Sequence, residues 1–292
     1  MNKFKRVAIY SSKNDKQILE IASHCIEVLK NQEIEIILTD NLVSLKKSGL
    51  KVYKNQNNLI NKTDLIISIG GDGTLLGCAR RYGFFGIPVL GINLGNLGFL
   101  ADIPPEAISN SLLEVINGNY IKDSRFFLEA NLTHKNKKFI ALNEIVIHSG
   151  AIAQLIDYEV YIDSLFAYRQ RADGLIINTP TGSTAYSLSG GGPIVHPGLD
   201  AITLLPMFPH SLNTSPLVIS SKSEIKIVMK KNKSRAMLSL DSHDSLMLKA
   251  EDSLIIKKAR SELTLIHPLG HDFFSSCRNK LGWSSSIANG SS

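Results

Sequence analysis

The chain has 292 residues, of which 43% are hydrophobic and 20% are charged, and its formal net charge is +6. This is the composition of an ordinary globular protein long enough for about two domains. Lysine and arginine are scattered rather than gathered into a stripe, which argues against a nucleic-acid partner. Solubility alone explains the positive excess, although it would also help to attract polyphosphorylated small molecules.

Three widely spaced cysteines, Cys25, Cys78 and Cys277, form no Cys-x-x-Cys pair. This argues against a disulfide framework or a zinc ribbon and favours a reducing compartment. Residues 1–10 lack the apolar run of a signal peptide, and no stretch is apolar for long enough to span a membrane. The expected location is the cytoplasm, without a membrane partner.

The first part of the chain alternates strand and helix patterns. Apolar positions of residues 18–29 fall on one helical face, and further helices are expected at residues 74–82 and 105–116. The expected strands are residues 6–10, 33–39, 64–69 and 87–92. This alternation predicts parallel pairing with right-handed crossovers. Residues 54–62 form a polar, Asn-rich connector that is expected to form no core.

The pattern changes after Asn117-Gly118-Asn119. Residues 120–267 alternate apolar and polar positions between turns, which predicts a mainly antiparallel β region. Its expected strands are residues 130–134, 140–148, 158–162, 224–229 and 253–256. Aromatic residues in 271–283 are expected to pack back onto a core before a disordered, Ser-rich tail. The predicted fold class is an α/β N-terminal domain plus a mainly antiparallel β C-terminal domain.

A glycine-rich turn, Gly70-Gly71-Asp72-Gly73-Thr74, directly follows the third expected strand and opens a helix. Its glycines let backbone N–H groups approach a ligand, and the helix N-terminus adds a partial positive field suited to phosphate. Asp72 would repel a pyrophosphate, but beside a hydroxyl it could act as a general base. The alternative is that Asp72 only caps the helix, and the turn alone does not decide between these two roles.

Other nucleotide-binding and hydrolase signatures are weaker or missing. The spacing Gly71-x-Gly73-x-x-x-Gly77 is similar to a Rossmann fingerprint. The next strand, however, ends at Asn93, where an NAD-dependent oxidoreductase normally has an acidic residue for the ribose. The sequence contains no Gly-Lys dipeptide, which excludes a Walker-type P-loop, and no Gly-x-Ser-x-Gly elbow.

A second turn, rich in hydroxyl groups, follows the apolar run at residues 175–177. Pro180 and Gly182 force the chain to turn after this expected buried strand. Ser and Thr also populate ordinary turns, but their number here favours a loop that binds ribose or phosphate oxygens. The hydroxyl groups expected at its surface belong to Thr179, Thr181, Ser183, Thr184 and Tyr186.

Taken together, these residues resemble the NAD kinase family. The likeness runs from about residue 64 to about residue 270, in the family's order. Its Gly-Gly-Asp-Gly element is shared with lipid kinases and phosphofructokinases, whereas the Thr-Pro-Thr-Gly-Ser-Thr-Ala-Tyr segment at residues 179–186 is much more specific. The matching segments are residues 70–74, 91–100, 143–144, 173–186, 191–193 and 206–210.

The resemblance implies transfer of the terminal phosphoryl group of ATP to the 2′-hydroxyl of the adenosine ribose of NAD, giving NADP. Asp72 would be the general base, with Gly73 beside it in the dinucleotide site, and Asn143 and Glu144 would contact the adenosine half. The NAD pocket would be completed by Arg171, Asp173, Thr184, Ala185, Tyr186, Ser187, Leu188 and Ser189.

Residue chemistry agrees with these roles. A carboxylate assists attack by a hydroxyl that is protonated at neutral pH, and an amide both donates and accepts hydrogen bonds. Arg171 could grip a phosphate bidentately or be a plain surface cation. Outside the resemblance, Asn143 could be a turn residue and Glu144 a solvated strand residue.

One position departs from the family pattern. Asp241-Ser242-His243 stands where the family usually has Asp-Gly-Gln or Asp-Ser-Gln. Because imidazole changes its charge near neutral pH, the contact made by that Gln is in doubt, and His243 is only a candidate NAD-binding residue. His210 is expected to be a buried structural histidine.

Further expectations concern partners and organisation. A divalent cation, expected to be Mg²⁺, would accompany ATP; its protein ligands are not identifiable, and no tightly bound cofactor is expected. The resemblance implies a homodimer or homotetramer with the NAD site near a subunit contact. The expected domains are residues 1–118, the β-rich NAD-binding residues 119–270, and a tail at 271–292 that packs on the first domain. The rival functions are a lipid-type kinase and a dinucleotide-binding sensor without catalysis.

Overall fold

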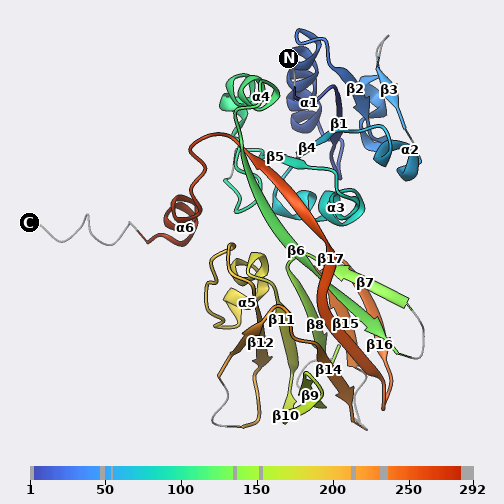
Figure 1. Cartoon of the computed structure of the whole chain (residues 1–292), viewed down its shortest axis with the longest axis vertical. Helices are drawn as coiled ribbons and strands as arrows, with labels where there is room; N and C mark the ends of the chain where they lie inside the picture. The colour runs from blue at the N-terminus through green and yellow to red at the C-terminus, as the bar shows by residue number, and fades with distance from the viewer. Residues whose placement is uncertain are drawn as a thin grey trace, which may run out of the picture. The chain divides into compact units, whose positions relative to one another are not determined.

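Figure 1 shows the computed structural model, which describes residues 3–46, 50–53, 55–95, 97–133, 137–150, 154–211, 215–230 and 236–283. The chain divides into two compact units. The first comprises Met1–Ser124 and Glu262–Ser292, and the second comprises Arg125–Ser261. Two long strands, β6 (Ile121–Leu132) and β17 (Ser253–His267), contribute residues to both units. The boundaries expected from the sequence, at 118 and 270, lie just outside these two strands.

The first unit is built on a parallel sheet with the order β17-β5-β4-β1-β2-β3. Every pair in this order is parallel, as the alternation of strands and helices predicted. The central strand β4 is buried along its whole length, because layers of helices cover both faces of such a sheet. Its other strands are β1 (Arg6–Tyr10), β2 (Glu35–Leu38), β3 (Lys51–Val52), β4 (Leu65–Ile69) and β5 (Val89–Ile92).

Helices α1 (Lys16–Lys30) and α4 (Ile108–Ile116) contact each other and share one core cluster with the sheet. The apolar stripe of α1 predicted this burial. Helix α3 (Asp72–Arg81) packs on β4 and β5, and α6 (Phe273–Leu281) ends the described chain. Short 3₁₀ segments are η1 (Asp40–Leu45), η2 (Gly83–Phe85) and η3 (Pro105–Ala107).

The expectation that residues 54–62 form no core is wrong. They contain a short helix, α2 (Gln56–Ile60), and Leu59 within it is buried. The side chain of Asn55 accepts a hydrogen bond from the N–H of Asn57, so one of the asparagines that suggested a loop in fact caps a helix. Lys54 lies outside the described residues.

The second unit packs two antiparallel sheets around one apolar core, as expected for a β region with alternating burial. One sheet has the order β13-β12-β11-β8-β15-β16, and the other contains β10-β9-β14-β17 with β6 and β7 alongside. Its remaining strands are β7 (Lys137–Ala141), β8 (Glu144–His148), β9 (Ile156–Ile162), β10 (Leu165–Ala172), β11 (Gly174–Asn178), β12 (Ala201–Met207), β13 (Leu217–Ser220), β14 (Ile225–Met229), β15 (Ala236–Leu240) and β16 (Asp244–Leu248).

Some strand boundaries differ from those expected. The strand expected at residues 140–148 is two strands, β7 and β8, separated at Leu142 and Asn143. The strands expected at 130–134 and 253–256 are parts of the longer β6 and β17; His134 lies outside the described residues. In the part of the chain that the structure describes, no helix has the length and apolar character needed to span a membrane. All three cysteines are buried free thiols.

Candidate active site

In the first unit, the glycine-rich turn places Asp72 as the first residue of α3. Gly70 has a φ of +148°, and a Cβ there would lie 2.5 Å from Thr74 Oγ1, so a side chain would not fit. The Asp72 carboxylate accepts three backbone hydrogen bonds from the segment that follows β5. Phe99 N–H donates to Oδ2 at 2.9 Å, and the N–H groups of Leu100 and Ala101 both donate to Oδ1 at 3.1 Å.

These contacts bear on the two roles expected for Asp72, general base and helix cap. The helix cap is Gly71, and no side chain caps α3, so Asp72 does not serve as the cap. Two N–H donors fill the acceptor positions of Oδ1, whereas Oδ2 accepts one N–H and a longer hydrogen bond from Lys280. The ammonium of Lys280, on α6, lies 3.5 Å from Oδ2. A carboxylate has about four acceptor positions, so a substrate hydroxyl would take the place of Lys280, whose contact with Oδ2 is the longest of the four.

In the second unit, the hydroxyl-rich turn follows β11 as η4 (Thr181–Thr184) and α5 (Tyr186–Ser189). Three of its hydroxyl groups are not at the surface, contrary to expectation. Thr179 Oγ1 donates to the carbonyl of Leu142 at 2.6 Å, and Ser183 Oγ donates to that of Pro180 at 2.6 Å. Thr181 Oγ1 accepts from Arg125 at 3.1 Å. These buried hydroxyls hold the turn in shape, and Tyr186 remains exposed.

The turn packs directly on the gap between β7 and β8. A Cβ on Gly182 would collide with the carbonyl of Asn143, so only glycine allows this approach. Asn143 also accepts a hydrogen bond from Thr179 N–H at 2.9 Å. On the other side, the buried carboxylate of Asp241 accepts from the N–H groups of Leu142, Asn143 and Glu144 at 2.9, 2.8 and 3.1 Å. Asp241 therefore satisfies the backbone where the strand is interrupted.

Four buried side-chain atoms around this junction have no hydrogen-bond partner within the described part of the chain. Glu144 and Asn178 are directly opposite each other on β8 and β11, and Asn143 is the neighbour of Glu144. The four atoms are Asn143 Oδ1, Glu144 Oε2, Asn178 Oδ1 and Ser187 Oγ. Because buried polar atoms are almost always hydrogen-bonded, such a group marks a place where a polar ligand would supply the missing partners.

The electrostatics of Glu144 are unusual. Burial, and secondarily the nearby charge of Asp241, raise the pKa of Glu144 to about 8. The side chain therefore carries a proton at neutral pH in the ligand-free protein, and it can both donate and accept a hydrogen bond. A strongly shifted carboxyl beside unpartnered amides is typical of a functional site.

Replacing Gly182 by Ala tests the close approach of the hydroxyl-rich turn to the backbone of Asn143. The new methyl group would press on the backbone of Asn143, so we expect the free energy of unfolding to fall by about 1–3 kcal/mol, as for other overpacked sites. Gly73→Ala is the matched control, because a Cβ there meets nothing within 4 Å in a helix. That change should raise stability by about 0.5–1 kcal/mol. Urea unfolding measures both, and equal effects would contradict the proposed packing.

Arg171 and Asp173 lie at the other end of β11 from Asn143 and Glu144. Arg171 is exposed on β10, and Asp173 precedes β11 and hydrogen-bonds through its backbone to Met207 and Ser149. Gly174–Asn178 contains 5 residues, which at about 3.4 Å per residue separate the two ends by about 17 Å. The fold of one chain therefore does not bring Arg171 and Asp173 to the Asn143–Glu144 junction.

The other candidate NAD-binding residues vary in exposure. Thr184, Ala185 and Leu188 are half-buried, Ser187 is buried and Ser189 is exposed. His243 is exposed in the turn between β15 and β16, two residues after Asp241. His210 is exposed as well, so the expectation of a buried structural histidine is wrong.

Two residues near these candidates were missed by reasoning from the sequence. Asp241 was noted only as part of the motif that leads to His243, although its φ of +47° and that of Ser242, +59°, mark a left-handed turn that aims the carboxylate inward. Lys280 lies 208 positions from Asp72 in the chain, and no local pattern links the two.

Comparison with known proteins identifies the family of both parts of the chain. Residues 7–120 match the ATP-NAD kinase N-terminal domain, and residues 142–268 match the ATP-NAD kinase C-terminal domain. The chain is 44% identical over 268 residues to an NAD kinase from Teredinibacter turnerae, covering 90% of this chain and 92% of the relative. It is 40% identical over 291 residues to one from Chromohalobacter salexigens, covering 98% and 99%.

Solved structures give the same result. The yeast NADH kinase complexed with NADH has a TM-score of 0.89 at 29% identity, covering 100% of this chain and 91% of that one. An Archaeoglobus fulgidus NAD kinase in complex with ATP has a TM-score of 0.72 at 26% identity, covering 95% and 97%. The fold and the matches define a phosphotransferase that uses a nucleotide. The chain belongs to the NAD kinase family.

Proposed function

We propose that this enzyme transfers the terminal phosphoryl group of ATP to the 2′-hydroxyl of the adenosine ribose of NAD, giving NADP. The observation that carries the proposal is the group of four unpartnered buried polar atoms at the junction of β8, β11 and the hydroxyl-rich turn. A dinucleotide offers the hydroxyl and ring-nitrogen groups that such amides and carboxyls bind. Asn143 and Glu144 would hold the adenosine half.

Asp72 would act as the general base. The longest of its four contacts is that of Oδ2 with Lys280 at 3.5 Å, which a ribose hydroxyl would replace, and its side chain is 28% exposed. The three N–H donors fix its orientation, which general-base catalysis requires. Gly73 follows at the start of α3, where the N-terminal helix field favours phosphate.

ATP would enter as its magnesium complex. The cation neutralises charge on the transferring phosphoryl group and belongs to the substrate. Phosphoryl transfer needs positioning and electrostatic stabilisation more than covalent chemistry from the protein.

A second copy of the chain would complete the NAD pocket. Arg171 and Asp173 are about 17 Å from the end of β11 that meets Glu144, so we propose that they reach the pocket of a partner copy in a homodimer or homotetramer. Mixing Asp173→Asn chains with Glu144→Gln chains tests this. Partial recovery of activity in the mixed oligomer is expected, whereas no recovery, or a purely monomeric protein in sedimentation, would contradict it.

The three free thiols support a cytoplasmic location.

The direct test is an assay of NADP formation. Purified protein is incubated with NAD and Mg²⁺ and either ATP or inorganic polyphosphate, and NADP is quantified with an NADP-specific dehydrogenase. We expect NADP with ATP. If NADP forms only with polyphosphate, ATP is not the phosphoryl donor. If NADP forms with neither donor, the protein is not an NAD kinase and is at most a dinucleotide-binding protein without catalysis.

A further inference from the structure

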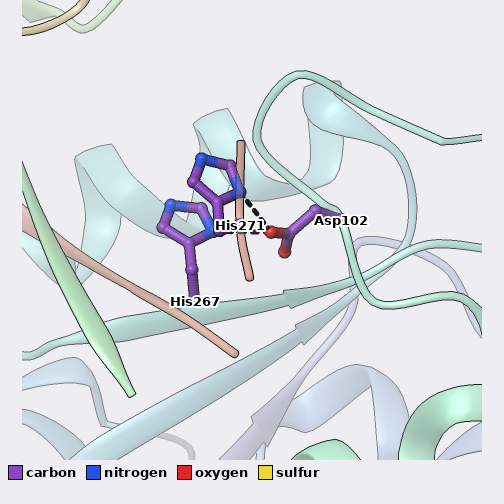
Figure 2. A group of neighbouring side chains, drawn as sticks. All are labelled: Asp102, His267 and His271. Atoms are coloured by element: carbon purple, nitrogen blue, oxygen red, sulfur yellow. Dashed lines mark hydrogen bonds and ion pairs between the residues drawn. The ribbon is translucent and has the colours of Figure 1, made fainter. Parts of the chain in front are cut away.

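Three side chains from distant parts of the sequence meet in the first unit (Figure 2). Asp102 follows β5, His267 ends β17, and His271 lies just before α6. The Nδ1 atoms of His267 and His271 lie 2.8 and 2.7 Å from the same oxygen, Asp102 Oδ2. The two rings stack with their centroids 3.7 Å apart at an interplanar angle of 14°.

Hydrogen bonding within the described residues leaves this cluster incomplete. Asp102 Oδ1 is buried and has no hydrogen-bond partner, and neither has the buried Nε2 of His267. The nearest carboxylate to that nitrogen is Asp123, whose Oδ2 lies 3.7 Å away. A neutral His267 with its proton on Nδ1 would turn a bare Nε2 lone pair toward this carboxylate, whereas an imidazolium would donate to both. Against the effect of burial, Asp102 and Asp123 raise the pKa of His267.

We propose that Asp102, His267 and His271 bind a divalent transition metal, with Zn²⁺ as the representative ion. One possible ligand atom from each side chain lies within 4.8 Å of the others, and the two Nδ1 nitrogens are the ring atoms that contact the carboxylate. Zn²⁺ bonds such atoms at about 2.0–2.2 Å, which places neighbouring tetrahedral ligands about 3.3 Å apart. The present separations of 2.7–2.8 Å would need to open by about 0.5 Å, and the two stacked rings would need to turn so that both Nδ1 lone pairs point at the ion.

The surroundings of His267 fit a metal ligand. With Nδ1 on the metal, the ring proton moves to Nε2 and points to Asp123, 3.7 Å away. A carboxylate behind a ligating histidine is the usual outer partner in metal sites, because it fixes the tautomer and the ring orientation.

The cluster is also accessible and selective. Asp102 and His271 line a cavity of about 270 Å³, together with Ser111 and Ser275, which gives an entry path and room for a water as fourth ligand. Imidazole suits zinc and its neighbours, whereas Mg²⁺ prefers an all-oxygen octahedron. The site would therefore not compete for the magnesium that accompanies ATP. A bound ion would tie the start of α6, which carries Lys280, to the segment after β5.

Zinc titration of the full chain tests this proposal. After treatment with a chelator, the protein is titrated with Zn²⁺ alone in excess Mg²⁺ by calorimetry, and with Co²⁺ as a visible-absorption probe. We expect one ion per chain and the intense bands of a low-coordinate Co²⁺ site. His271→Gln should weaken binding at least tenfold and abolish those bands. Asp123→Asn, which removes no ligand, should weaken it about 10- to 100-fold.

His24→Gln is the matched control, because His24 is an exposed histidine on α1 whose Nε2 lies 2.8 Å from Ser109. Zn²⁺ should raise the thermal unfolding midpoint of the wild type and of the His24 variant, but not that of His271→Gln. Circular dichroism checks that each variant is folded. The proposal is overturned if the wild type shows no saturable Zn²⁺ binding, or if both the His271 and Asp123 variants bind as the wild type does. The cluster would then be a hydrogen-bonded pair of histidines without a metal.

Discussion

Asp72→Asn is expected to lower kcat for NADP formation by about 10²–10⁴-fold while the affinity for NAD changes little. The reason is that a neutral amide cannot accept the proton of the ribose hydroxyl as phosphorus is attacked, and general-base catalysis typically contributes this factor. Steady-state kinetics give kcat, and calorimetric titration with NAD gives the affinity. A variant with near wild-type turnover would exclude Asp72 as the base.

The structure also supplies a competing cause that the experiment must separate. Asp72 accepts N–H groups from Phe99, Leu100 and Ala101, and an amide has one acceptor oxygen instead of two. The substitution would leave at least one of those donors unpaired, at a cost of about 1–3 kcal/mol. Lost turnover could then reflect a displaced turn.

Gly91→Ala provides the matched control for this displacement. A Cβ on Gly91 would lie 2.7 Å from Ala101 Cα and 2.7 Å from Leu75 Cδ1, so it disturbs the same segment without touching the carboxylate. We expect Gly91→Ala to be destabilised in urea unfolding yet to keep far more turnover than Asp72→Asn. If both variants lose turnover equally, Asp72 is a positioning residue and the base lies elsewhere.

The sequence predicted the parallel sheet because its information there is local. Each strand is a short apolar run, and the stripe of α1 repeats at helical spacing, so burial follows directly from the pattern. The prediction for residues 54–62 was wrong because a local pattern is ambiguous there: asparagine is common in loops and also caps helices.

The interior of the candidate site could not be predicted, because it depends on contacts between distant residues. Leu142 meets Asp241 across 99 positions of the chain, and that contact interrupts the strand expected at 140–148. The hydroxyls of Thr179 and Ser183 point inward because Gly182 seats the turn on Asn143. Residue types predicted a binding loop, but only the packing shows which of its side chains are buried in the turn itself.

Glu144→Gln is expected to change both stability and binding, and the sign depends on pH. The pKa of Glu144 is raised from the reference value of 4.5 to about 8. Between these two pH values the folded protein keeps the proton on Glu144, whereas the unfolded chain has lost it. Stability attributable to this group is therefore fully present below pH 4.5 and is lost as pH rises toward 8. At one pKa unit per 1.36 kcal/mol, the loss by pH 9 approaches about 5 kcal/mol.

Glutamine resembles the protonated side chain at every pH, so the variant should be more stable than the wild type at pH 9 and similar to it at pH 5. Urea unfolding between pH 5 and 9 measures the difference. In the NAD complex Glu144 is expected to give up its proton and accept from sugar hydroxyls as a carboxylate, which glutamine cannot do, so the same change should weaken NAD binding about 10- to 100-fold.

Glu159→Gln is the matched control in the same unit. Lys230, 2.9 Å away, and the Tyr161 hydroxyl, also at 2.9 Å, hold the pKa of Glu159 below its usual range. Its stabilising contribution is present above the unfolded pKa, so the control should gain no stability at pH 9 and should bind NAD normally. An unchanged pH slope in Glu144→Gln would mean that Glu144 is ionised in the folded protein, and the unpartnered Oε2 would then need a cation or a water to explain it.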